Sequence, residues 1–202
     1  HTDHNNGKVL AASINLDAIA IAAKRDDMKI NEKSEGHGLN EVDISTLSPD
    51  EAEYGRSSSM IKGVAAGLKE KGYEIGGFDA CTTSDVMGGS GLSSSAAFEV
   101  LIATVINHLY NDGKIDAVTV AKAAQFSENV YFGKPSGLLD QMASSVGTFV
   151  TIDFKDTANP VIKKVDFDFA KSGYSLCIVD THGNPVSYTH LRAHETRGNL
   201  VC

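Results

Sequence analysis

The residues best suited to chemistry stand in mid-chain, where three glycines and four serines fall within the eight positions from Gly88 to Ser95. Glycine lets a backbone turn tightly and come close to a ligand. An apolar-rich run with helical spacing follows, from Ala96 to about Leu109. Because the free N–H groups and the dipole at a helix N-terminus favour an anion, this segment predicts a phosphate-binding loop rather than a flexible linker.

Two common nucleotide-binding patterns do not fit this loop. The P-loop needs a lysine directly after its last glycine, and Leu92 occupies that place. The dinucleotide-binding fingerprint needs a third glycine, and after the helix a strand that presents an acidic residue. Neither is present in the sequence, so the loop belongs to another class.

The run from Gly91 to Ala96 resembles the GLSSSA loop of the GHMP kinases. Within that family, residues 133–141 and residues 1–10 resemble two segments of the galactokinases, and the three segments occur in the expected order. The resemblance covers about residues 1–184. It implies an α+β fold, namely the GHMP-kinase N-terminal domain (ribosomal protein S5 domain 2-like).

The resemblance implies ATP and Mg²⁺ as cofactors. In this family the loop and its helix hold the nucleotide phosphates. The matching residues are Gly89, Ser90, Gly91, Leu92, Ser93, Ser94, Ser95 and Ala96. Magnesium would be held by Ser95 and by Glu128, whose surroundings resemble a galactokinase segment with a magnesium carboxylate. From the residues alone, Glu128 could also be an exposed charge on a helix.

The resemblance also implies a galactose site. Asp140 matches the acid that contacts the reacting sugar hydroxyl, either as general base or as a group that orients the hydroxyl. From the residue type alone, it could instead be a helix-capping acid. Gly137 lies in the same segment, while His1 and Asp3 match side chains that hold galactose hydroxyls.

The function implied is ATP-dependent phosphorylation of the anomeric hydroxyl of α-D-galactose, giving galactose 1-phosphate. Two alternatives stay open: an N-acetylgalactosamine kinase, and a galactokinase-like sugar sensor without turnover. The intact serine loop favours an enzyme over a sensor.

The ends of the chain depart from the family pattern. The chain begins inside the first signature, and residues 185–202 match no part of the family. We therefore expect residues 1–184 to be an N-terminal domain truncated at its start and residues 185–202 to be a non-native tail. A phosphoryl-stabilising arginine and the second domain would be missing, so we expect such a fragment to be inactive.

Two features near the expected site have simpler interpretations. Lys134 stands among glycines and could be a phosphate-binding lysine, but we interpret it as a solvated loop charge. Residues 57–64 stand where galactokinases commonly have a segment with an aromatic residue, and here that residue is absent. The sequence therefore assigns no residue to pack against the adenine base.

The composition limits the possible partners. The chain has 202 residues and a formal net charge of −8, which argues against binding to nucleic acid or to an anionic membrane. No apolar stretch is long enough to span a membrane, and no secretory signal is visible. We expect a cytoplasmic monomer whose partners are galactose and ATP, with Cys81 and Cys177 as reduced core residues.

The elements that must position these residues can be placed coarsely. Helices are expected over 58–71, from Ala96 to Leu109, after a cap at Asp116, and over 138–145. Strands are expected over 28–32, 73–86, 147–153, 161–169 and 174–180, with 33–53 as a surface loop. Residues 9–14 and 16–23 predict two paired strands that are buried on both faces.

Overall fold

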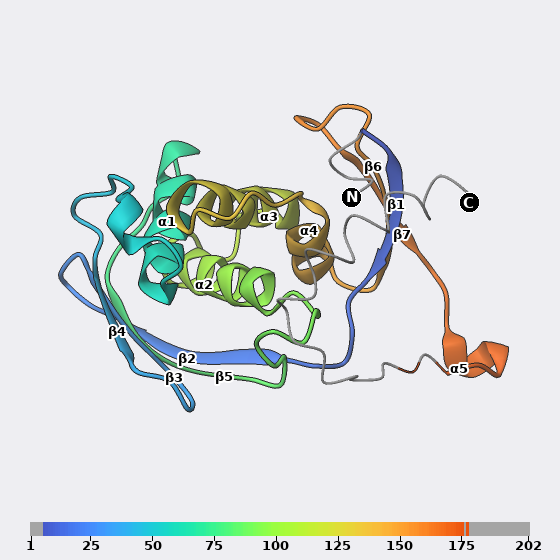
Figure 1. The fold of residues 1–202 in the computed structure, drawn as a ribbon, viewed down its shortest axis with the longest axis horizontal. Helices are drawn as coiled ribbons and strands as arrows, with labels where there is room; N and C mark the ends of the chain where they lie inside the picture. Colours follow the sequence, from blue (N-terminus) through green and yellow to red (C-terminus); the bar gives the residue numbers. More distant parts are fainter. Residues whose placement is uncertain (1–5, 176, 178–202) are drawn as a thin grey trace.

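The computed structural model describes residues 6–175 and 177 and contains two separate sheets (Figure 1). The four-stranded sheet has the order β2-β5-β3-β4, and only its β3–β5 pair is parallel. Its strands are β2 (Ala18–Lys24), β3 (Lys29–Ser34), β4 (Leu39–Asp43) and β5 (Phe78–Ser84). The antiparallel three-stranded sheet has the order β1-β6-β7, with β1 (Lys8–Ala12), β6 (Phe149–Asp153) and β7 (Val161–Val165).

Helices α1, α2 and α3 lie on one side of the larger sheet, α4 stands beside the smaller sheet, and α5 lies apart from both (Figure 1). The helices span Ser57–Glu70 (α1), Ser94–Tyr110 (α2), Ala117–Phe126 (α3), Leu139–Val146 (α4) and Phe169–Ser172 (the short α5). A 3-10 turn, η2, spans Glu51–Glu53, and the π-helical segment η3 (Ser127–Tyr131) continues α3. Among the described residues, no helix has the length and apolar character that crossing a membrane requires.

Local sequence signals explain where the helices begin and end. The Asp116 carboxylate accepts hydrogen bonds of 3.0 Å from the N–H groups of Val118 and Thr119, which confirms the expected cap of α3. Gly147 follows α4 with a φ of +73°, a conformation that glycine adopts without strain. The helices over 58–71 and 138–145 are confirmed within one residue at each end.

Each sheet has its own apolar core. The larger core lies between the four-stranded sheet and helices α1, α2 and α3, and includes Ile30, Phe78 and Ile106. The smaller core lies between α4 and the three-stranded sheet, and includes Met142 and Ile152. The α+β fold class expected from the sequence is therefore confirmed, with the cores side by side.

The predicted pairing of the first two strands is wrong. β1 pairs with β6 in one sheet and β2 pairs with β5 in the other, so the chain crosses between sheets at residues 13–17. Burial on both faces is also wrong, because helices cover only one face of the larger sheet (Figure 1). Ile19 and Ile21 point outward and are 56% and 80% exposed.

Three further expectations need correction or lie outside the described residues. The predicted loop 33–53 contains β4, where Val42 faces the core, and Ile44 just beyond it is fully buried. Cys81 is exposed rather than buried, because β5 alternates and turns Ala80 and Thr82 inward; Cys177 is exposed too. The strand predicted over 174–180 falls mostly outside the described residues.

Candidate active site

The serine loop, residues 88–95, leads into α2, and backbone N–H groups at the start of this helix make no hydrogen bond within the described residues. Gly89 and Gly91 have φ values of +77° and +78°, which a larger residue adopts only with strain. Ser93 is the N-cap residue of α2, yet it has a left-handed φ of 61° and its side chain makes no capping bond. Among the described residues, the N–H groups of Ser94, Ser95 and Ala96 have no acceptor. The start of α2 can therefore donate hydrogen bonds to an anion.

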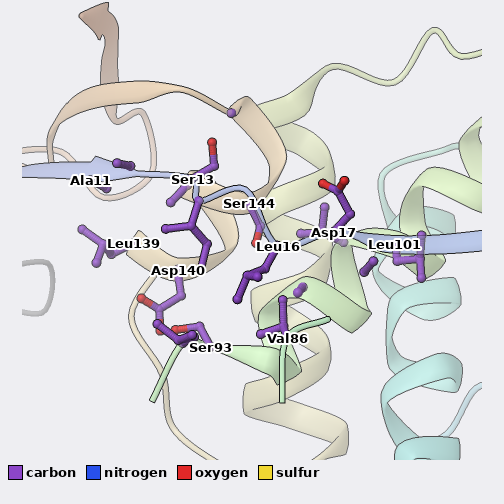
Figure 2. Close-up of a pocket in the computed structure, with 18 of the residues that line it drawn as sticks. Ala11, Ser13, Leu16, Asp17, Val86, Ser93, Leu101, Leu139, Asp140 and Ser144 are labelled. Atoms are coloured by element: carbon purple, nitrogen blue, oxygen red, sulfur yellow. The ribbon is translucent and has the colours of Figure 1, made fainter. Parts of the chain in front are cut away.

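A cavity of about 590 Å³ lies between this loop and α4. Leu92 and Ser93 line one side of it, Leu139 and Asp140 line another, and the crossing segment 11–18 forms a third wall. Figure 2 shows the side chains of Asp140 and Ser93 next to each other at the cavity. The predicted catalytic acid and the predicted phosphate loop thus share one cavity.

The segment before α4 fixes the position of Asp140. The Asn129 side-chain oxygen accepts hydrogen bonds from the Ser136 N–H at 2.6 Å and from the Ser136 hydroxyl at 3.2 Å, which ties this segment to η3. Asp140 then falls in the first turn of α4, where the helix dipole favours a carboxylate. It is exposed and makes no hydrogen bond with a described residue, so it caps nothing. Gly137 is half-buried in the preceding segment and does not line this cavity.

Glu128 is the centre of a buried polar cluster. Its side chain is only 3% exposed. One carboxylate oxygen accepts hydrogen bonds from the Ser95 hydroxyl at 2.9 Å and the Lys134 ammonium at 2.8 Å, and the other accepts one from the Gln141 amide at 2.6 Å. The interpretation of Glu128 as an exposed charge is therefore wrong. The interpretation of Lys134 as a solvated loop charge is confirmed, because its side chain is 56% exposed, but its ammonium also forms an ion pair with Glu128.

The π-helical turn explains why the cluster can form. Its wider winding turns the neighbouring Ser127 and Glu128 inward together, and both are buried. Burial would raise the pKa of Glu128, but the hydrogen bonds from Lys134 and Ser95 and the Lys134 charge outweigh it and leave the pKa below its usual range. The carboxylate is thus kept in its charged form.

Ser95 and Glu128 have the donor chemistry of a magnesium site. A hydroxyl and a carboxylate oxygen suit a hard cation, which in nucleotide enzymes takes one or two protein ligands and completes its shell with phosphate and water. Within the described part of the chain, no three His, Cys, Asp or Glu side chains form a metal cluster. One hydroxyl and one carboxylate match the one or two protein ligands that such a cation takes.

A second cavity, of about 550 Å³, lies on the other side of the loop. Gly88, Ser94 and Ser95 line it, and Met60, Phe98 and Phe132 supply apolar and aromatic surface. Ala18, Val86 and Leu101 line both cavities, so the two are neighbours separated by the loop and the start of α2. Phe98 and Phe132 are aromatic residues that the sequence did not assign to this site.

Some predicted site residues lie outside the described part of the chain, and two buried polar residues near the site were not predicted. His1 and Asp3 lie outside the described residues, as does the tail 185–202. Glu99 and Gln141, both fully buried beside Glu128, were not singled out from the sequence. The available signal for Glu99 was its position, because a charged residue one helical turn after Ser95 interrupts the apolar face of α2.

Comparison with known proteins places this geometry in a family. Residues 59–148, which include the loop, α2, Glu128 and Asp140, match the model of the GHMP kinases N-terminal domain. The chain is 34% identical over 204 residues to a galactokinase of Streptomyces coelicolor, covering 100% of this chain and 51% of the relative. It is 39% identical over 157 residues to a galactokinase of Pyrococcus furiosus, covering 78% and 43%.

Solved structures agree with the sequence relatives. The galactokinase of Lactococcus lactis, solved in complex with galactose, is 31% identical and superimposes with a TM-score of 0.72, over 84% of this chain and 44% of that one. A mevalonate kinase superimposes with a TM-score of 0.65 at 16% identity, which supports the fold alone. The chain spans about half, or less, of the length of the curated relatives it matches. By sequence, fold and the match over its central loop, the chain belongs to the GHMP kinase family.

Proposed function

We propose that this chain is the nucleotide- and sugar-binding part of a galactokinase, which transfers the γ-phosphoryl group of ATP to the anomeric hydroxyl of α-D-galactose. The observation that carries the proposal is the cavity that Asp140 shares with the start of α2. Phosphoryl transfer depends chiefly on holding acceptor and phosphate in line and on stabilising charge, and these residues supply one group for each partner. The galactokinases that the chain matches support the choice of sugar.

The phosphates of ATP would lie against the loop and the start of α2. The N–H groups of Ser94, Ser95 and Ala96 have no acceptor among the described residues, and the positive end of the helix dipole adds to their attraction for an anion. Gly89 and Gly91 carry no side chain that would hold a phosphate away from the backbone. The remaining loop residues, Ser90, Leu92 and Ser93, shape this turn.

Ser95 and Glu128 would hold Mg²⁺ beside the phosphates, and the bound ion would neutralise charge on the phosphate oxygens. Lys134 already balances the Glu128 charge, and its side chain is 56% exposed.

Asp140 would act on galactose from the opposite wall of the cavity. Its carboxylate makes no hydrogen bond with a described residue, so it can accept one from a sugar hydroxyl. It would serve as general base or orient the anomeric hydroxyl, and both roles need the carboxylate within hydrogen-bond reach of that oxygen. Gly137, His1 and Asp3 are the further sugar contacts that the family resemblance implies.

The nucleoside would occupy the second cavity. Because the loop lies between the two cavities, phosphates held there would connect a nucleoside on one side to a sugar on the other. Phe98 and Phe132 offer flat aromatic contacts for a purine, and Met60 adds apolar surface, in place of the aromatic residue absent from residues 57–64.

Titration calorimetry on the 202-residue chain tests the proposal. In the presence of Mg²⁺ and a non-hydrolysable ATP analogue, galactose should bind more tightly than glucose or N-acetylgalactosamine. Asp140→Asn should weaken galactose binding about tenfold, the effect of one lost hydrogen bond to a charged group. The matched control is Asp112→Asn, an exposed acid that lines neither cavity.

The outcomes separate the candidate functions. Tighter binding of N-acetylgalactosamine would identify that sugar as the substrate instead. Equal galactose affinity in Asp140→Asn and Asp112→Asn would remove Asp140 from the sugar site. Failure of the ATP analogue to bind would contradict the assignment of the serine loop.

A further inference from the structure

Glu32 is a buried acidic residue that the proposed function leaves unexplained. It lies on β3, is 0% exposed, and points to the same side of the sheet as Ile30. None of the ion pairs between described residues includes it. A buried carboxylate without a cation is unfavourable unless hydrogen bonds satisfy it, so its donors explain how it is held there.

Three side chains donate to this carboxylate. One of its oxygens accepts hydrogen bonds from the hydroxyls of Ser34 and Thr82, both at 2.6 Å, and the other accepts one from the Asn40 amide at 2.7 Å. The sheet register brings these groups together. Asn40 on β4 lies opposite Glu32. Thr82 on β5 lies opposite Ser34, which follows two residues later on β3.

The donors connect the buried carboxylate to the second cavity. All three line that cavity, but Glu32 itself does not. Ser57, the first residue of α1, lines the cavity too, and its hydroxyl donates to the Asn40 side-chain oxygen at 2.9 Å. Glu32 is therefore the buried end of a network whose outer members border the cavity, and it can act on a ligand only through them.

The network uses up the hydroxyl hydrogens of its members. The oxygens of Ser34 and Thr82 are also 2.7 Å apart. Each hydroxyl has one hydrogen, so both hydrogens are spent within this pair and the carboxylate, whichever way each one points. The hydrogen of Ser57 is likewise spent on Asn40. The four side chains therefore offer a ligand the lone pairs of three hydroxyl oxygens and at most one hydrogen, the second N–H of Asn40.

Two parts of the cavity lining suit different parts of a ligand. Gly88, Ser94 and Ser95 belong to the loop and the start of α2, which favour an anion. The network instead favours a group that donates hydrogen bonds, because its hydroxyl oxygens present acceptors. Among the described residues that line this cavity, none is a lysine or an arginine that would counter this preference.

We propose that Glu32 is a positioning residue that sets the base specificity of the second cavity. By holding the hydrogens of its three donors, it leaves acceptors for the amino group of adenine and disfavours a purine with a carbonyl at the same ring position. Such a carbonyl would meet lone pairs and stay unpaired, and polar sites gain specificity from this kind of mismatch. The inference rests on the proposed function in one respect, namely that the nucleoside occupies this cavity.

Glu32→Gln tests the carboxylate with almost no change of volume, because the amide replaces one acceptor oxygen by an NH₂ donor. If this donor faces Asn40, the Asn40 amide must turn its oxygen toward it and direct its own hydrogens elsewhere. If the donor faces Ser34 and Thr82, it releases a hydroxyl hydrogen. Either arrangement frees a hydrogen that the carboxylate held, so the preference for an amino group should be lost.

Titration calorimetry measures this preference on the 202-residue chain with Mg²⁺ and the β,γ-imido analogues of ATP and ITP, whose bases differ in the amino and carbonyl group. The parent should bind the ATP analogue about tenfold more tightly, the effect of one hydrogen bond. Glu32→Gln should bring the ratio of the two affinities close to one. A purely structural role would weaken both analogues together and leave the ratio unchanged.

Glu41→Gln is the matched control. It makes the same substitution at an exposed residue next to Asn40 on β4, and Glu41 lines neither cavity. This variant should keep the affinity ratio of the parent. If circular dichroism shows that Glu32→Gln does not fold, Ser57→Ala replaces it. This variant removes the hydroxyl that holds the Asn40 oxygen and one acceptor of the network, and it should lower the ratio as well.

Nuclear magnetic resonance gives a readout without a ligand. In chains with isotope-labelled asparagine, the signals of the Asn40 side-chain amide should move in Glu32→Gln, because its acceptor changes. They should stay in place in Glu41→Gln, because neighbouring strand residues point to opposite faces of the sheet. Signals that stay in place in both variants would contradict the role of Glu32 in orienting Asn40.

The binding results separate this inference from the proposed function. Equal affinity of the parent for the two analogues, or the parent's ratio in a folded Glu32→Gln, would overturn base selection while the chain still bound a nucleotide. If the parent bound neither analogue, the nucleoside site of the proposed function would be contradicted and base selection with it. The amide signals would then still decide whether Glu32 orients Asn40.

Discussion

Replacing Gly63 with alanine tests how closely α1 must approach the segment that carries Glu128. A methyl group added there would lie 2.7 Å from the Ser127 Oγ, 2.8 Å from the Tyr131 Cβ and 2.9 Å from the Ser127 Cα. Two of these atoms cannot swing aside, because they belong to or adjoin the backbone. The third is held in place, since the Ser127 hydroxyl donates a 2.8 Å hydrogen bond to the Met60 carbonyl.

The expected loss of stability follows from two opposing terms. Overpacking a tight contact costs about 3 kcal/mol at the upper end of its usual range, which applies because the neighbours are rigid. Alanine gains about 1 kcal/mol over glycine in helix propensity. The net loss of about 2 kcal/mol in the free energy of unfolding corresponds to a melting temperature lower by about 4–8 °C for a domain of this size.

The assay is thermal unfolding followed by circular dichroism, with Gly67→Ala as the matched control on the same helix. Its added methyl group would meet nothing closer than 3.1 Å, where it contacts the Phe126 ring. Both variants gain the same helix propensity, so the difference between them isolates the contact with η3. If Gly63→Ala melts no lower than Gly67→Ala, the close packing of α1 on η3 is not as the structure has it.

Three shorter predictions concern single side chains. Asp140→Asn should melt within about 2 °C of the parent in the same assay, because the side chain is exposed and makes no hydrogen bond with a described residue; a large drop would indicate a structural role. Ser95→Ala removes a donor from Glu128 and should weaken Mn²⁺ binding in the presence of an ATP analogue about tenfold, whereas the same affinity would exclude Ser95 from that site. Asp116→Ala should lower the free energy of unfolding by about 1 kcal/mol at neutral pH in urea titrations. Burial opposes ionisation of Asp116, but its hydrogen bonds with Thr119 and Val118 hold the pKa below the ordinary 3.8, so the parent's advantage should be full above pH 3.8 and shrink as the pH falls through the lower folded-state pKa.

The helices were predictable because their signals are local. Asp116 caps α3 through its own neighbours, and Gly72 ends α1 with a φ of +85° that favours glycine. The loop and Asp140 were likewise recognisable from short motifs. What brings them to one cavity is the packing of α2 beside α4 and the crossing at residues 13–17, and neither leaves a local signal.

The errors share one physical origin, which is that burial depends on distant partners. β1 and β2 have similar compositions, but β1 pairs with β6 in one sheet and β2 pairs with β5 in the other. β4 was missed because Val42 is the only buried residue in a short polar strand. The exposure of Lys134 was predictable, but its ion pair was not, because only the fold brings Glu128 within 2.8 Å of it.

The pairing of β1 with β6 sets the order in which the protein can be completed as it leaves the ribosome. Lys8 faces Asp153 and Ala12 faces Phe149, so β1 cannot pair until β6 has been synthesised. The other sheet and α1, α2 and α3 are finished earlier, and they can collapse onto their own core first. Pairing between strands so far apart in the sequence slows folding, and until it forms β1 has an unpaired edge. A nascent chain arrested before residue 149 would lack β6, and Ala11 and Ala12, which line the cavity between the loop and α4, would have no strand to pair with.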